Sequence, residues 1–186
     1  MPGYKFTTDW FSQNIPVWER IFSDFKPESV LEIGSYEGRS AVWMAEMMHN
    51  QLNGGHIDCI DTWPDGDVQN RFEDNIKIAQ WKFPGVRIRS YKIPSYEIAA
   101  FKRINEYDLV YIDGSHKASE VLSDAVDAYH LCRHGGVIIF DDYNNGGASA
   151  DNPLDLPKIA VDAFLKCFGR EVEIIHRDYQ LIVRKK

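Results

Sequence analysis

Short apolar segments alternate with longer stretches of helical periodicity along most of the chain. A short apolar run is typical of a buried strand, and apolar residues spaced three or four apart are typical of an amphipathic helix. On this basis, strands are expected at residues 29–33, 56–60, 86–90, 108–112, 137–140, 171–176 and 180–184. Helices are expected at about 39–50, 67–80, 95–103, 117–132 and 155–167.

The order of these segments predicts an α/β fold. Alternating strands and helices favour a parallel sheet with helices on both faces. The last two strands are joined only across residues 177–179, which predicts an antiparallel hairpin. We therefore expect a Rossmann-like fold with a central, mainly parallel seven-stranded sheet that ends in an antiparallel strand. Ligands of such sheets bind beyond the carboxyl ends of the strands.

The length of 186 residues suits a single domain. Residues 1–27 form its N-terminal helical segment and residues 28–186 its Rossmann-like core. Within the first part, residues 8–25 predict one or two helices whose apolar face either packs on the sheet or covers a substrate. That face comprises Trp10, Phe11, Val17, Trp18, Ile21 and Phe22.

Composition and charge narrow the range of partners. Apolar residues make up 44% and charged residues 26%, as in ordinary globular proteins. The net charge of −7 disfavours nucleic-acid and membrane partners. Three cysteines without a CxxC pair disfavour a disulfide framework or a zinc site. The absence of an apolar segment near residue 1 predicts a cytoplasmic location.

A glycine loop follows the first predicted strand. Gly34 permits a tight turn, and a helix beginning near Gly38 would direct free amides toward a carboxylate or phosphate. The spacing Gly-x-x-x-Gly differs from the G-x-G-x-x-G pattern of dinucleotide sites. A plain glycine-rich turn is the alternative interpretation.

The next two strands end in further candidates for cofactor binding. Asp61 follows the second strand, and an acid there can accept hydrogen bonds from both hydroxyls of a ribose. An acid can also occur there by chance. Thr62 and Trp63 would flank an adenine or the entry to a pocket. After the third strand, Ser95 can cap the helix that follows.

Three carboxylates follow the fourth and fifth strands. Asp113 comes after one strand, and Asp141 and Asp142 come after the other. If these strands are neighbours, the carboxylates meet, and such a cluster takes up protons or holds a cation. Oxygen ligands suit Mg²⁺, Mn²⁺ or Ca²⁺ better than zinc. Alternatively, some of these acids point to solvent or cap the next helix, or Asp113 binds the cofactor alone.

His116 lies three residues after Asp113. An imidazole with an ordinary pKa near ~6.5 can accept a proton at neutral pH, so His116 is a candidate general base. It could instead be a solvent-exposed residue at a helix start. The polar, glycine-rich segment 143–153 is either a lid over the substrate or an ordinary connecting loop.

The sequence of residues 30–42, Val-Leu-Glu-Ile-Gly-Ser-Tyr-Glu-Gly-Arg-Ser-Ala-Val, resembles motif I of class I S-adenosylmethionine-dependent methyltransferases. It is especially similar to the loops of catechol and macrolide-sugar O-methyltransferases. The resemblance implies that S-adenosylmethionine is the cofactor and that Glu32 helps to hold the loop. It also implies that Ser40 binds the cofactor's carboxylate. The loop residues implied to line the methionine part are Gly34, Ser35, Tyr36 and Gly38.

The same resemblance extends to the other strand ends. It assigns the ribose to Asp61 with Thr62 beside it, and the adenine to Ser95 and Tyr96. Metal-dependent O-methyltransferases carry acids at the positions of Asp113, Asp141 and Asp142. Catechol enzymes place a lysine base where this chain has His116, whereas macrolide-sugar enzymes place a histidine there. The resemblance therefore favours a sugar or natural-product acceptor over a catechol.

Together these observations predict an O-methyltransferase that modifies a small hydroxylated molecule with help from a divalent cation, Mg²⁺ by preference. His116 and Asp113 would be its catalytic residues. One alternative is a metal-independent methyltransferase in which Asp113 and Asp142 position the acceptor. Others are an NAD-linked oxidoreductase and a non-catalytic cofactor-binding protein. Nucleic-acid methylation is disfavoured by the charge. Exposed N-terminal aromatics would allow a homodimer.

Overall fold

The computed structural model describes residues 3–100, 106–145 and 152–186. The chain divides into two compact units, residues 1–93 and 94–186, and each is described by itself. All seven expected strands are present, three in the first unit and four in the second. Within the described ranges, no helix is long and apolar enough to span a membrane.

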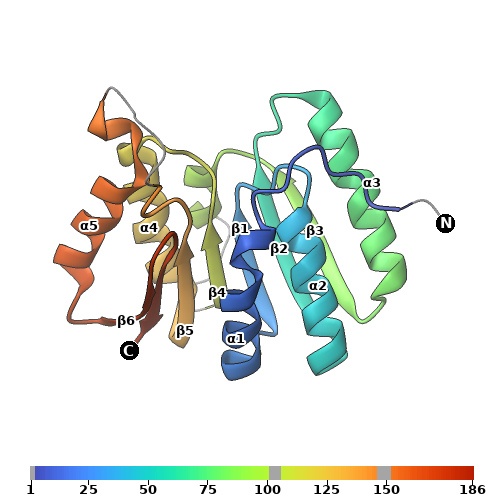
Figure 1. Ribbon diagram of the computed structural model, residues 1–186, viewed down its shortest axis with the longest axis horizontal. Coiled ribbons are helices and arrows are strands. Elements are labelled where there is room, and N and C mark those ends of the chain that lie inside the picture. Colours follow the sequence, from blue (N-terminus) through green and yellow to red (C-terminus); the bar gives the residue numbers. More distant parts are fainter. Residues whose placement is uncertain (1–2, 101–105, 146–151) are drawn as a thin grey trace. The chain divides into compact units, whose positions relative to one another are not determined.

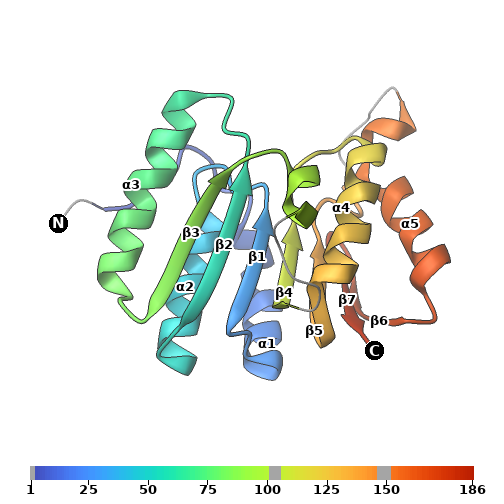
Figure 2. The same cartoon turned by 180° about the vertical axis from the view of Figure 1, so that it is seen from behind.

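The first unit contains three parallel strands in the order β3-β2-β1. They are β1 (Ser29–Ile33), β2 (Gly55–Asp61) and β3 (Val86–Lys92), connected by α2 (Arg39–Leu52) and α3 (Gly66–Lys82). All of β1 is buried, including the polar residues Ser29 and Glu32, as is typical of a parallel strand that is covered on both faces. Figures 1 and 2 show α2 on one face of these strands together with α1 (Ile15–Phe25).

The N-terminal helices of this unit are held by an aromatic cluster. The short 3-10 helix η1 (Ser12–Asn14) leads directly into α1. Trp18 and Phe22 are fully buried, and their rings lie 5.9 and 5.2 Å from the ring of Trp43 on α2. The apolar face of α1 is therefore buried against α2, and the predicted packing of this face on the sheet stays a prediction. Trp10, by contrast, is 63% exposed.

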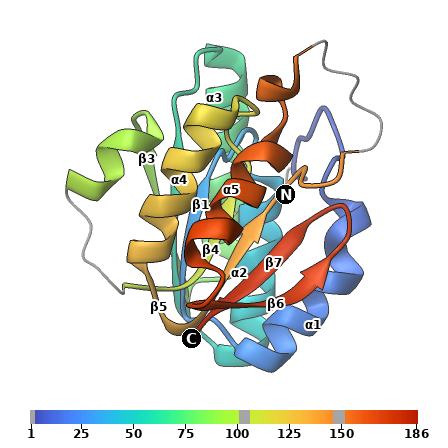
Figure 3. The ribbon, with the colours of Figure 1, turned by 90° about the vertical axis from the view of Figure 1, so that its left-hand side faces the viewer.

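The second unit contains four strands in the order β4-β5-β7-β6. Strands β4 (Tyr107–Ile112) and β5 (Cys132–Phe140) are parallel. Strand β7 (Leu181–Lys185) is antiparallel to both β5 and β6 (Val172–Arg177), which confirms the predicted C-terminal hairpin. Helices α4 (Ala118–Leu131) and α5 (Pro157–Phe168) lie side by side, as Figure 3 shows.

Several predicted boundaries differ from the structure, two of them in ways that the sequence explains. Strand β5 begins at Cys132 rather than at Val137. Near its start Arg133 and His134 are polar and exposed, so this part of the sequence lacks the pattern of a buried strand. The helix expected at 95–103 is a 3-10 helix, η2 (Ser95–Ala100), and residues 101–103 lie outside the described ranges. Of the predicted lid at 143–153, residues 146–151 also lie outside them, and η3 (Pro153–Asp155) follows.

Candidate active site

The glycine loop leaves β1 with a left-handed backbone at several positions. Gly34 and Gly38 have φ angles of +88° and +79°, and Tyr36 has +45°. The amide of Gly34 donates to the carbonyl of Ile60 over 2.8 Å, which ties the loop to β2. Helix α2 starts directly after the loop, and its first-turn amides have no acceptor within the helix. The loop and this helix start form a set of donors suited to an anion.

Asp61 holds the glycine loop in this conformation. Its Oδ2 accepts the backbone amides of Ser35 and Tyr36 at 3.1 and 2.9 Å. Its Oδ1 accepts the amide of Trp63 at 2.7 Å. The acid predicted to bind a ribose therefore also fixes the loop predicted to bind the methionine part. Its ribose role remains a prediction.

Trp63 completes the link between the two strand ends. Its side chain is 2% exposed, and its indole Nε1 donates to the carbonyl of Tyr36 over 2.8 Å. Its backbone has a φ of +38°, a conformation that costs a non-glycine residue about 1 kcal/mol or more. Thr62, just before it, is exposed. The surrounding contacts of Trp63 therefore impose the backbone turn after β2.

Glu32 and Ser40 form a buried pair at the base of the loop. Glu32 is completely buried, and the hydroxyl of Ser40 donates to its Oε1. Its Oε2 is buried and has no hydrogen-bond donor among the described residues. Burial raises the pKa of Glu32, and the neighbouring side chains of Ser35, Ser40 and Cys59 oppose this. An unpartnered buried oxygen is a fit for a ligand ammonium group, whereas the hydroxyl of Ser40 is already committed to Glu32.

The predicted adenine contacts lie in η2 of the second unit. Tyr96 is 69% exposed. Ser95 forms a hydrogen bond with the carboxylate of Asp124, a buried residue of α4. Burial raises the pKa of Asp124 to about 6, and the bond from Ser95 partly offsets that effect. Ser95 thus has a structural partner, and its contact with adenine remains a prediction.

Asp113 and Asp141 meet at a single phenol. The hydroxyl oxygen of Tyr111 lies 2.9 Å from Oδ2 of Asp113 and 2.7 Å from Oδ2 of Asp141. One hydroxyl proton can serve only one of the two carboxylates. Burial raises the pKa of Asp141. Its other oxygen accepts the amide of Gln180 at 2.9 Å.

Asp142 holds His116. Nε2 of His116 lies 2.8 Å from Oδ2 of Asp142, and this hydrogen bond raises the pKa of His116. The other oxygen of Asp142 accepts the hydroxyl of Tyr179 and, at 3.2 Å, the side-chain amide of Asn145. The backbone of Asp142 has a φ of +53°. The imidazole itself is 56% exposed, so it is oriented by a carboxylate yet accessible.

The predicted metal site does not fit this arrangement. Among the described residues, no group of three or more His, Cys, Asp or Glu side chains is placed to hold a metal ion. In the structure, each of the four oxygens of Asp141 and Asp142 lies within hydrogen-bond distance of a protein donor. Those donors are Gln180, Tyr111, His116, Tyr179 and Asn145.

Several residues of the site were not predicted. Tyr111 lies two residues before Asp113, and the alternation of side chains along a strand places such a pair on the same face. That signal could have identified it. Tyr179 and Gln180 lie at the turn of the predicted hairpin, where the sequence indicates only a connection between two strands. Glu37, within the glycine loop, also gave no signal.

The sequence pattern of the methyltransferase domain family matches residues 31–143, more than half of the chain. The matched part begins within β1 and ends just after Asp142, so it includes the glycine loop and the carboxylates. The chain therefore belongs to the methyltransferase domain family.

A curated relative is the uncharacterized protein R132 of Acanthamoeba polyphaga mimivirus, 27% identical over 141 residues. The match covers 73% of this chain and 61% of that protein, so the chain spans less than two thirds of its length.

Solved structures of O-methyltransferases share the fold. The Bacillus cereus O-methyltransferase in complex with SAH is 17% identical, with a TM-score of 0.67 and coverage of 96% of this chain and 84% of that one. The O-methyltransferase TomG of Streptomyces achromogenes, which is involved in tomaymycin synthesis and was solved with SAM, is 16% identical. Its TM-score is 0.70, with coverage of 96% and 82%. The expected methyltransferase fold is confirmed.

Proposed function

We propose that this protein transfers a methyl group from S-adenosylmethionine to a hydroxyl group of a small molecule, of the sugar or natural-product type. Membership of the methyltransferase domain family supports the reaction class. The choice of an oxygen nucleophile rests on one observation: an accessible histidine held by a carboxylate, His116 on Asp142. A hydroxyl must lose a proton during methylation, and this pair is suited to accept it.

The donors of the first unit suit the cofactor. The unpartnered Oε2 of Glu32 would accept the ammonium group, and the first-turn amides of α2 would meet the carboxylate. Asp61 would accept the ribose hydroxyls while it keeps the amides of Ser35 and Tyr36. S-adenosylmethionine supplies an electrophilic methyl group on a positively charged sulfur.

Methyl transfer would form a bond from the acceptor oxygen to the methyl carbon while the carbon–sulfur bond breaks and its electron pair passes to sulfur. His116 would take up the hydroxyl proton. Because Nε2 of His116 faces Asp142, the neutral imidazole keeps its proton there and presents a lone pair on Nδ1. The resulting imidazolium is stabilised by the Asp142 carboxylate. Such general-base assistance contributes roughly 10²–10⁴ in rate.

Divalent-metal assistance is a second form of this proposal, predicted by the family resemblance. One observation bears on it: the phenol of Tyr111 lies within hydrogen-bond distance of both Asp113 and Asp141, so these two carboxylates are close together. Either a proton on Asp141 or a cation would relieve the repulsion between them. An ion at Asp141 and Asp142 would have to displace the hydrogen bonds from Gln180 and Tyr179.

The test is transfer of isotopically labelled methyl from S-adenosylmethionine to a panel of sugars, phenols and other alcohols, with amines and thiols for comparison. We expect label in a hydroxylated acceptor, and a loss of at least about 100-fold with His116→Ala. Transfer to amines alone would contradict an oxygen acceptor. Chelation with EDTA followed by Mg²⁺ separates the two forms: unchanged activity favours the proton, and loss with recovery favours the ion.

A further inference from the structure

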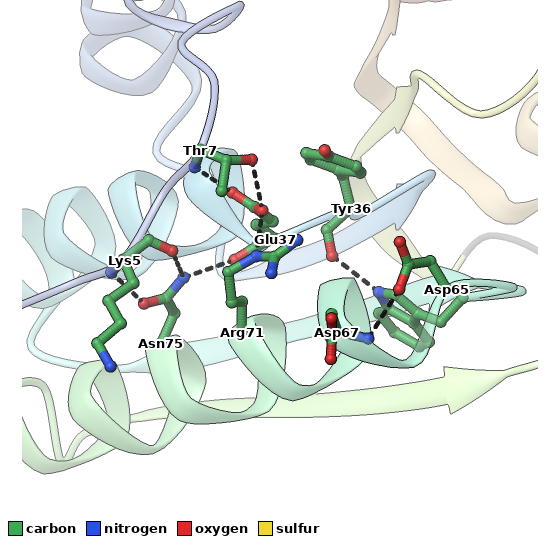
Figure 4. Close-up of polar contacts among 9 residues, drawn as sticks. Lys5, Thr7, Tyr36, Glu37, Asp65, Asp67, Arg71 and Asn75 are labelled. Atoms are coloured by element: carbon green, nitrogen blue, oxygen red, sulfur yellow. Dashed lines mark hydrogen bonds and ion pairs between the residues drawn. The ribbon is translucent and has the colours of Figure 1, made fainter.

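Residues 4–12, named here the N-terminal strap, run along α3 and the glycine loop (Figure 4). The strap is held by side chains of other elements. Lys5 donates its backbone amide to Oδ1 of Asn75 over 2.8 Å, and Asn75 returns a bond of 2.9 Å to the Lys5 carbonyl. This two-point contact resembles the pairing of neighbouring strands, so it fixes the direction of the strap as well as its position.

Glu37, a residue of the glycine loop, is the second attachment. Its side chain is only 2% exposed although it lies in a surface loop. One carboxylate oxygen accepts the backbone amide of Thr7 at 2.6 Å. The other accepts the Thr7 hydroxyl at 2.8 Å and Nε of Arg71 at 2.5 Å. Hydrogen bonds to an ionised group are roughly twice as strong as neutral ones.

The charge of Glu37 is maintained at neutral pH. Burial alone would raise the pKa of this carboxyl, but the hydrogen bonds from Thr7 and Arg71 outweigh it and hold the pKa below its ordinary value. The loop therefore contributes the charged carboxylate of Glu37 to this attachment, and the strap contributes two neutral donors, the amide and the hydroxyl of Thr7.

Helix α3 joins the loop and the strap. Arg71 and Asn75 lie one helical turn apart and so share a face. Asn75 is 1% exposed, and besides Lys5 it binds the backbone carbonyl of Glu37 over 2.9 Å. A single side chain therefore contacts both segments, so displacement of the strap removes a partner of the loop.

The strap also reaches the start of α2. Arg39 donates to Asp9 over 2.7 Å and to the Ser12 hydroxyl over 3.0 Å. The ring of Trp10 lies 5.4 Å from that of Tyr36. Arg39 is the first residue of α2, whose amides are the proposed donors to the cofactor's carboxylate. The strap therefore contacts residues on both sides of Gly38, Tyr36 in the glycine loop and Arg39 in α2.

The backbone of the loop depends on these contacts. The amide and carbonyl of Tyr36 are bound by Asp61 and Trp63, and the carbonyl of Glu37 by Asn75. Tyr36 is left-handed, a conformation that persists only when its surroundings impose it. Two of those surroundings, Asp61 and Trp63, belong to the cofactor site. The third, Asn75, also binds Lys5 of the strap.

We infer that Glu37 is a positioning residue that couples docking of the N-terminal strap to binding of the cofactor. The inference rests on the proposed function for the identity of that cofactor. Coupling between two binding events is reciprocal. A docked strap must therefore strengthen cofactor binding, and the bound cofactor must hold the strap more firmly.

The primary test compares Glu37→Gln with Asp74→Asn, which removes the same charge from an exposed ion pair on α3. Calorimetry should show S-adenosylmethionine binding about tenfold more weakly to Glu37→Gln, within the usual range of coupling, and unchanged to Asp74→Asn. Hydrogen exchange of the strap amides should be faster in Glu37→Gln without any ligand. In the parent protein, saturating S-adenosylmethionine should slow it.

A milder pair of variants covers the case in which Glu37→Gln fails to fold. Thr7→Val removes only the hydroxyl donor to Glu37, and Thr7→Ser restores it. We expect cofactor binding weakened about threefold in the first and recovered in the second, as one lost hydrogen bond implies. If the Thr7 hydroxyl acted on stability alone, Thr7→Val would change the free energy of unfolding and leave the affinity for S-adenosylmethionine unchanged.

The results separate the inference from the proposed function. If the parent binds S-adenosylmethionine but the strap exchanges equally fast with and without it, the coupling is wrong and the proposed function stands. Equal affinities of Glu37→Gln and the parent for S-adenosylmethionine would likewise contradict the coupling and leave the proposed function standing. If the parent binds neither S-adenosylmethionine nor its demethylated product, the proposed function and the coupling both fail.

Discussion

The glycine loop after β1 and the carboxylate cluster after β4 and β5 are built in different ways. In the loop, backbone amides and carbonyls are bound by side chains of other elements, including the buried side chains of Asn75 and Trp63. In the cluster, side chains bind one another through hydroxyl and carboxyl groups, and Asp113 and His116 remain exposed. One region is a rigid cradle of backbone groups, and the other is a set of titratable groups.

The difference matches two chemical tasks. A site that recognises a fixed ligand gains affinity when its donors are held in place before binding. A group that accepts a proton must be reachable and must change charge, so it needs an orienting partner more than it needs burial. Changes in the cluster should therefore alter turnover, and changes around the loop should alter cofactor affinity and stability.

The largest effect is expected for His116→Ala. Loss of the general base should lower kcat by roughly 10²–10⁴ without changing the affinity for S-adenosylmethionine. Steady-state kinetics with the acceptor found in the label screen, together with calorimetry, give both quantities. His130→Ala, an exposed histidine on α4, is the matched control and should behave as the parent does. Full activity of His116→Ala would remove the proton-accepting role.

Asp61→Ala should chiefly affect the cofactor. It removes the acceptor of three backbone amides as well as the proposed ribose contact, so the Kd for S-adenosylmethionine should rise by about 100-fold. The free energy of unfolding should fall by roughly 1–3 kcal/mol.

Asp65→Ala is the comparison for Asp61→Ala, because Asp65 only caps α3 by accepting the amide of Asp67. It should lose about 1 kcal/mol of stability and keep its cofactor affinity. Equal loss of affinity in both variants would mean that the two acids act through stability alone.

Gly38→Ala should have a smaller effect, on stability. Gly38 has a φ of +79°, and a Cβ there would lie 3.0 Å from Cδ2 of Phe72. The left-handed backbone costs an alanine roughly 1–2 kcal/mol, measurable by chemical denaturation. Gly66→Ala, at the open start of α3 with nothing within 4 Å of the added carbon, should be neutral or stabilising. Comparable losses in both would show that the loop conformation is not demanding.

The smallest effect is a shift in pH dependence. The hydrogen bond with Asp142 raises the pKa of His116 above its ordinary 6.5, and the base acts only when neutral. The value of kcat/KM should therefore fall as the pH drops through that raised pKa. Asp142→Asn removes the carboxylate and should move the midpoint down toward 6.5. An unchanged midpoint would show that Asp142 does not act on His116.

The same pair has a consequence for stability with the opposite dependence on pH. Because the folded pKa of His116 is raised, protonated His116 contributes stability that is fully present below its unfolded pKa. That contribution disappears as the pH rises through the folded value. Thermal unfolding of the parent and Asp142→Asn should therefore differ more at pH 6 than at pH 9.

Most of the fold could be predicted from sequence because each strand is a local apolar run. Asp61, Asp113 and Asp142 were found for a related reason, since each follows such a run directly. Tyr179 and Asn75 could not be found in this way. Their partners Asp142 and Lys5 lie 37 and 70 residues away, and only tertiary packing brings them together. The start of β5 was missed because exposed polar residues hide its pattern.

The most direct test of the account is calorimetric titration of the parent protein with S-adenosylmethionine and, separately, with NAD. The account predicts that S-adenosylmethionine binds with one-to-one stoichiometry, that Asp61→Ala weakens this binding, and that NAD gives no measurable heat of binding. Binding of NAD without binding of S-adenosylmethionine would contradict it.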